Sequence, residues 1–140
     1  EAMTPEFVEY QKQVLANAKI LEQGFKDSGV KICFGQTDNH LLLLDVTPLG
    51  LTGKQAEAAL DAAGITVNKN IIPDDPRAPM DPSGIRLGTP AITTRGMKEP
   101  EMKKIAAWII EALAKHDDPS ALENTKKQVK EMTSKFSLFA

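Results

Sequence analysis

The sequence predicts an α+β fold, a two-layer sandwich with a small, mostly antiparallel sheet and helices on one face of that sheet. Two observations lead to this prediction. Four segments repeat apolar residues at helical spacing, and three short apolar runs between them have strand character. The expected order is helix, two strands, helix, short strands and two helices, which favours a small sheet covered mainly on one face. With 140 residues the chain can bury one core, so we expect a single domain over residues 1–140.

The first helix is expected to begin at Pro5, after Thr4 as the N-cap, and to end before Gly29. Proline fits the first helical position because the N–H group that it lacks has no helical partner there. The apolar residues that recur along one side are Phe7, Val14, Ala18, Leu21 and Phe25. This spacing predicts a long amphipathic helix.

Two strands are expected next. Residues 31–34 form a short apolar run, and residues 40–46 form the clearest strand, which we expect to be buried on both faces. Cys33, the only cysteine, lies in the first run and excludes an internal disulfide. Its apolar neighbours favour a buried, inert thiol over a nucleophile.

The second helix is expected from Thr52, which forms a capping box with Gln55, to Gly64. Thr66 and Val67 are candidates for an edge strand, and residues 85–87 for another short strand. The intervening loop, within residues 68–90, has prolines at three-residue intervals: Pro73, Pro76, Pro79 and Pro82. Prolines stiffen the chain, and a loop this long is usually functional or disordered. Its strand-like ends favour an ordered functional loop.

The last two helices are expected at about residues 98–115 and from Asp118 to about Phe136. The apolar stripe of the first comprises Met102, Ile105, Ala106, Ile109, Ala112 and Leu113. That of the second comprises Leu122, Val129, Met132 and Phe136. Both stripes follow the helical period, so each helix should pack one face on the core.

Arg86 is the first candidate for a binding residue. In a strand, alternation places its side chain on the face opposite Ile85 and Leu87. A guanidinium on a stiff element presents a planar fork that matches a carboxylate. The alternative is an arginine that pairs with a local acid such as Asp81 or reaches solvent.

Asn70 is the second candidate, because a primary amide both donates and accepts and can pair with the edge of a heteroaromatic ring. The alternative is a turn residue that bonds its own backbone. His40 and His116 are too isolated for a zinc site. The sequence has no Gly-rich phosphate loop, no GxSxG elbow and no Cys–His pair, so we expect no complete active site.

Composition excludes several classes of partner. The net charge is −2, from 17 basic and 19 acidic residues without a long run of either sign, so neither nucleic acid nor a membrane is an expected partner. The run of four leucines at residues 41–44 is too short to span a bilayer. No signal-peptide pattern is present, and a single thiol fits a reducing compartment, so we expect a cytoplasmic protein.

Several motifs resemble serine hydroxymethyltransferase, in that family's order and spacing. They are GQTDNHL at residues 35–41, LTGK at 51–54, ITVNKN at 65–70 and SGIRLGTPA at 83–91. The resemblance covers essentially the whole chain. The segment Met80, Asp81 and Pro82 departs from it, because many members have an aromatic residue and a threonine in this part of the loop.

The resemblance implies a carboxy-terminal small domain of a fold-type I pyridoxal-phosphate enzyme, a cytosolic homodimer. That enzyme interconverts serine and tetrahydrofolate with glycine and 5,10-methylenetetrahydrofolate. Arg86 is similar to the arginine that binds the amino-acid carboxylate, and Asn70 to the asparagine that contacts the folate pterin. The resemblance assigns no catalytic role to His40 or Arg95.

The large cofactor-binding domain is absent from these residues, including the lysine that binds pyridoxal phosphate. The resemblance therefore implies a fragment that is inactive alone and that works with its own large domain and a homodimer partner. The alternative is a free-standing, non-catalytic binding or assembly module of the same fold.

Overall fold

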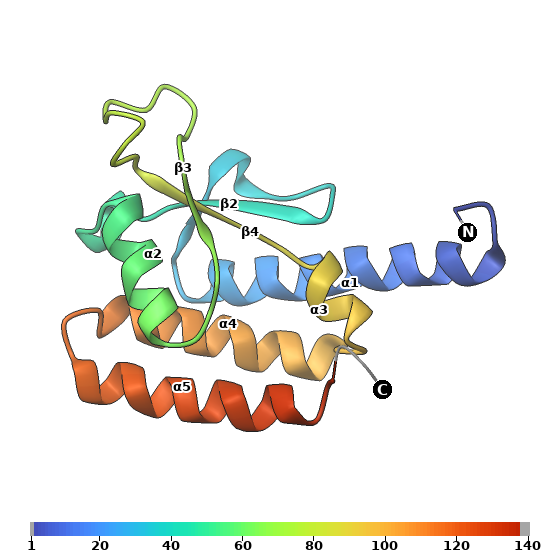
Figure 1. The fold of residues 1–140 in the computed structure, drawn as a ribbon. Helices are drawn as coiled ribbons and strands as arrows, with labels where there is room; N and C mark the ends of the chain where they lie inside the picture. The colour runs from blue at the N-terminus through green and yellow to red at the C-terminus, as the bar shows by residue number, and fades with distance from the viewer. Residues whose placement is uncertain (1, 138–140) are drawn as a thin grey trace.

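The computed structural model describes residues 2–137 and confirms the α+β class (Figure 1). The elements are α1 (Pro5–Asp27), β1 (Lys31–Ile32), the 3-10 helix η1 (Cys33–Gly35), β2 (Leu41–Asp45), the 3-10 helix η2 (Thr47–Leu49), α2 (Gly53–Ala62), β3 (Asn68–Asn70), β4 (Gly84–Gly88), α3 (Pro90–Thr94), α4 (Glu99–Ala114) and α5 (Pro119–Ser134). The sheet is open and antiparallel, in the order β1-β2-β4-β3. In Figure 1, α1, α4 and α5 lie on one side of it. No helix within residues 2–137 is long and apolar enough to cross a membrane.

The predicted helix starts are confirmed by their caps. The Thr4 hydroxyl accepts a hydrogen bond from the Phe7 amide at the start of α1. At α2 the Thr52 hydroxyl accepts from the Gln55 amide, and the Gln55 side chain accepts from the Thr52 amide. Each bond satisfies a backbone group that the helix itself leaves without a partner.

Two strand predictions need correction. Residues 66–67 are not a strand; the edge strand is β3, whose Asn68 pairs with Arg86 and whose Asn70 pairs with Gly84. β1 ends at Ile32, because the chain turns into η1 at Cys33, which is buried as expected. The short helix α3 was not predicted, since five residues are too few to show a helical period.

The leucines of strand β2 are fully buried on one face only, so the prediction of two buried faces is wrong. Leu42 and Leu44 are almost fully buried, whereas Leu41 and Leu43 on the other face are half-buried. Helices α1 and α2 pack on the strands from one side, and within residues 2–137 no element covers the other. We call this second side the open face of the sheet.

Helix α1 is attached to the body of the domain by a buried polar residue and a close crossing. The fully buried Asn17 amide donates to the Thr93 hydroxyl and to the Met97 carbonyl, at 2.9 and 3.0 Å. At Gly24 the helix approaches α4 so closely that an added Cβ would lie 2.8 Å from the Ala106 Cβ. A larger side chain there would force the two helices apart.

Candidate functional site

The open face of the sheet carries both predicted binding residues. Arg86 lies on β4 between Ile85 and Leu87, whose side chains are buried in the core, while Arg86 is exposed. Asn68 is the register partner of Arg86, and Asn70 lies two residues further along β3. Residues two apart share a face of a strand, so the Arg86 and Asn70 side chains project from the same side.

Both residues line one shallow pocket of about 430 Å³. The rest of its wall comes from η1, the turn after it and β2: Cys33, Phe34, Gln36, Thr37, Asp38, Asn39, Leu41, Leu42 and Leu43. The pocket therefore combines one cation, one carboxylate (Asp38), several amide and hydroxyl groups and an apolar floor. This combination suits a polar, partly aromatic ligand that carries an anionic group.

Arg86 is free to bind such a ligand. Within residues 2–137 its guanidinium makes no hydrogen bond or ion pair. The alternative pairing with Asp81 is wrong, because the Asp81 carboxylate pairs with Arg77 at 2.6 Å. The second part of that alternative, a side chain that reaches solvent, matches the exposed position of Arg86.

Asn70 retains an acceptor for a ligand. Its Nδ2 donates to the Ile71 carbonyl at 2.8 Å, which is the contact with its own backbone that the alternative interpretation described. The residue is half-buried in β3, however, and does not belong to a turn. Its side-chain oxygen has no donor within residues 2–137.

The wall of the pocket at Thr37 is held by a buried carboxylate of α1. Glu22 Oε2 accepts from the Thr37 amide at 3.0 Å, and the Lys19 ammonium donates to Glu22 and to the Thr37 carbonyl. Lys26 pairs with the other Glu22 oxygen at 2.6 Å. Burial alone would raise the pKa of Glu22, but these bonds to the charged form lower it to about 2.

We expect the free energy of unfolding to fall as pH drops from about 4.5 to about 2, because protonation of Glu22 then breaks its bonds in the folded state only. The pKa of Glu22 is lower in the folded state than in the unfolded state. Its stabilising contribution is therefore complete above the ordinary pKa of 4.5 and is lost below the folded-state pKa of about 2. Its size is roughly 1–3 kcal/mol. Urea unfolding of this chain at several pH values would measure it. Glu22→Gln should be less stable at pH 7 and should show a shallower pH dependence; parallel curves would contradict the assignment.

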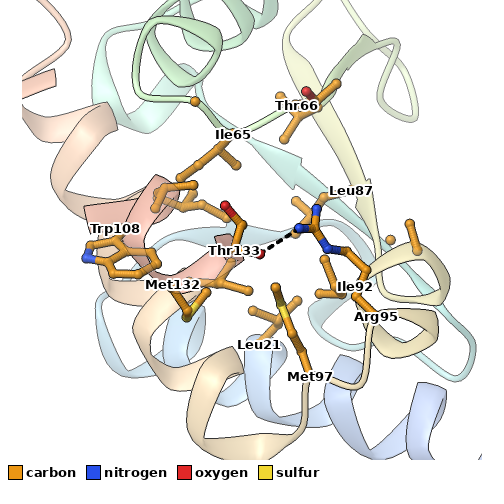
Figure 2. Close-up of a pocket in the computed structure, with 17 residues that line it drawn as sticks. Leu21, Ile65, Thr66, Leu87, Ile92, Arg95, Met97, Trp108, Met132 and Thr133 are labelled. Carbon is orange, nitrogen blue, oxygen red and sulfur yellow. Dashed lines mark hydrogen bonds between the residues drawn. The ribbon is translucent and has the colours of Figure 1, made fainter. Parts of the chain in front are cut away.

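Arg95 has a structural role at the other end of the domain. Its guanidinium donates to the Phe136 and Thr133 carbonyls at 2.7 and 2.9 Å, and so caps the end of α5. Figure 2 shows it beside an apolar cavity of about 370 Å³, whose lining includes Trp108 and Met132. This cavity contains neither Arg86 nor Asn70.

The remaining candidates offer no reactive group. Burial raises the pKa of the Cys33 thiol, which keeps the sulfur protonated and supports its interpretation as a core residue. His40 is exposed, and its backbone carbonyl accepts from the Thr89 amide at 3.1 Å. Among residues 2–137, no three His, Cys, Asp or Glu side chains lie close enough together to hold a metal ion.

The fold and the pocket together define an α+β domain that offers a cation and an amide to a ligand on an open sheet face. The sequence profile of the serine hydroxymethyltransferase family matches residues 1–109. The chain therefore belongs to the serine hydroxymethyltransferase family.

Curated relatives agree with this assignment and show how much of a member is present. The chain is 54% identical over 140 residues to a serine hydroxymethyltransferase of Myxococcus xanthus and 52% identical over 139 residues to one of Koribacter versatilis. These alignments cover 100% and 99% of this chain but 34% and 33% of the relatives. The chain thus spans about a third of the length of the curated relatives it matches, and corresponds to their carboxy-terminal segment.

Proposed function

We propose that residues 1–140 are the carboxy-terminal domain of an enzyme that interconverts serine and tetrahydrofolate with glycine and 5,10-methylenetetrahydrofolate. The observation that carries this proposal is the shared pocket of Arg86 and Asn70 on the open face. The carboxylate of an amino-acid substrate pairs well with a cation, and the heteroaromatic pterin ring of a folate pairs well with an amide. Family membership supports the same reaction.

In this proposal Arg86 binds the carboxylate of the amino acid. Its guanidinium is exposed and makes no ion pair within residues 2–137, so none must be broken on binding. Strand β4 is held on both sides, by β2 and by β3, which fixes the base of the side chain. A fixed fork can bind both carboxylate oxygens and so orient the substrate.

The residues of this chain do not fit pyridoxal phosphate, the cofactor that the family implies. The cofactor requires a lysine, and no lysine lines the pocket of Arg86 and Asn70. We propose that the large domain of the complete protein supplies the cofactor site, and that this chain alone is inactive.

The open face is the surface that we propose for contact with the large domain. Phe34, in the wall of the pocket on that face, is 80% exposed, and the loop after β3 exposes Ile71 (48%) and Met80 (80%). Exposed large apolar side chains are typical of an interaction surface. We further propose that the complete enzyme is a cytoplasmic homodimer.

Asn70→Ala in the complete protein tests the folate contact. We expect kcat/KM for tetrahydrofolate to fall by about 3- to 10-fold, the equivalent of one neutral hydrogen bond. Folate-independent cleavage of a hydroxy amino acid should change much less, because that reaction does not use the pterin. Steady-state kinetics of both reactions measure the difference. Equal losses in both would contradict a pterin contact, and a wild-type protein without any turnover of serine would favour a non-catalytic module.

A further inference from the structure

The loop between β3 and β4 is organised around one carboxylate. Asp75 Oδ1 accepts from the Ser83 hydroxyl at 2.6 Å and from the Arg77 amide at 2.9 Å. Its Oδ2 accepts from the Ser83 amide at 2.9 Å and from the Ile72 amide at 3.2 Å. Four donors thus converge on a half-buried side chain, and three of them are backbone amides.

These four bonds join the two ends of the loop. Ile72 lies two residues after Asn70, and Ser83 immediately precedes Gly84, where β4 begins. The two ends are also packed without free space: an added Cβ at Gly84 would lie 2.5 Å from Ile72 Cγ2 and 2.8 Å from the Asn70 carbonyl oxygen. The Asp75 carboxylate therefore ties the end of β3 to the start of β4.

The carboxylate keeps this role across the physiological pH range. Burial alone would raise the pKa of Asp75, but the bonds from Ser83, Arg77 and Ile72 hold it well below its usual range. It therefore accepts all four bonds in its charged form, which makes each of them stronger than a neutral bond.

We propose that Asp75 is a positioning residue for ligand binding, which sets the relative placement of Asn70 and Arg86 in their shared pocket. The inference rests on the proposed function of those two residues. Its basis is the connection itself: one side chain holds the segment after Asn70 against the segment before Arg86. All of the Asp75 hydrogen bonds stay within residues 72–83, so its loss loosens the loop and leaves the core in place.

Asp75→Asn in the complete protein is the test. Both carboxylate oxygens accept hydrogen bonds from backbone N–H groups. In either orientation of the asparagine, its NH2 group would therefore point at an N–H donor and lose that bond. We expect KM for serine and KM for tetrahydrofolate each to rise by about 3- to 10-fold, with a smaller change in kcat. A residue that served stability alone would lower the melting temperature without moving either KM.

Asp74→Asn is the matched control. It is the same chemical change one residue away, on an exposed side chain without a hydrogen bond within residues 2–137. Asp74 has a φ of 53°, a conformation that asparagine tolerates. Both KM values should therefore stay at the wild-type level. If Asp75→Asn is too unstable to assay, Ser83→Ala removes only the 2.6 Å bond and should raise both KM values by a smaller factor.

Two outcomes overturn the inference: unchanged KM values in Asp75→Asn, or equal rises in Asp74→Asn and Asp75→Asn. Arg86→Lys and Asn70→Ala, measured in the same assays, separate this failure from that of the proposed function. If those two variants lose binding while Asp75→Asn does not, the positioning role is wrong and the pocket stands. If they too behave like wild type, the pocket itself is wrong.

Discussion

Arg86→Lys in the complete protein is expected to lower kcat/KM for serine by about 10- to 100-fold. Lysine keeps the charge but replaces a planar fork by a single ammonium, so the proposed contact with the substrate carboxylate would lose at least one charge-assisted bond. One such bond contributes about 1.5–3 kcal/mol, which corresponds to this range. Steady-state kinetics with serine as the varied substrate measure the loss.

The melting temperature of Arg86→Lys should match that of wild type, because Arg86 is exposed and makes no hydrogen bond or ion pair within residues 2–137. Arg77→Lys is the matched control: Arg77 is also exposed, but it pairs with Asp81 and does not line the pocket. Its kcat/KM should stay near the wild-type value. Near-normal turnover in Arg86→Lys would refute the carboxylate contact.

The helices could be predicted because their signals are local. The Thr52–Gln55 capping box spans four residues, and the structure shows both of its hydrogen bonds. Strand β3 could not be found in this way. Asn68, Lys69 and Asn70 have no apolar pattern, and they form a strand because β4 is available to pair with them. That pairing joins residues far apart in sequence, which no local pattern records.

The direction of the Arg86 side chain was likewise predictable from alternation with Ile85 and Leu87. The other wall of the pocket was not, because it depends on Glu22, which bonds the Thr37 amide from a helix fifteen residues earlier. Gly53 shows the same limit. Its Cβ would collide with the carbonyl oxygens of Gly84 and Pro82, so only glycine lets α2 begin against β4. Sequence shows the glycine, but only the fold shows what approaches it.

Phe25→Ala should lower the free energy of unfolding of this chain by about 3–5 kcal/mol, the range for a buried phenylalanine. Phe25 is fully buried, on the side of α1 that faces the core. Alanine would leave a cavity that the packed neighbours fill only in part. Urea unfolding should show a lower midpoint with an unchanged slope, since the folded surface stays the same.

Phe34→Ala is the matched control for this stability prediction, because it makes the same change where the ring is 80% exposed. Phe34 has a φ of 64°, which is as unfavourable for alanine as for phenylalanine, so backbone strain does not change. We expect a change within about 0.5 kcal/mol. Equal losses at the two positions would mean that the Phe34 ring is buried in solution by a second surface. A large loss at Phe25 alone would show that Phe25 is buried and that the Phe34 ring is exposed in solution, as in the structure.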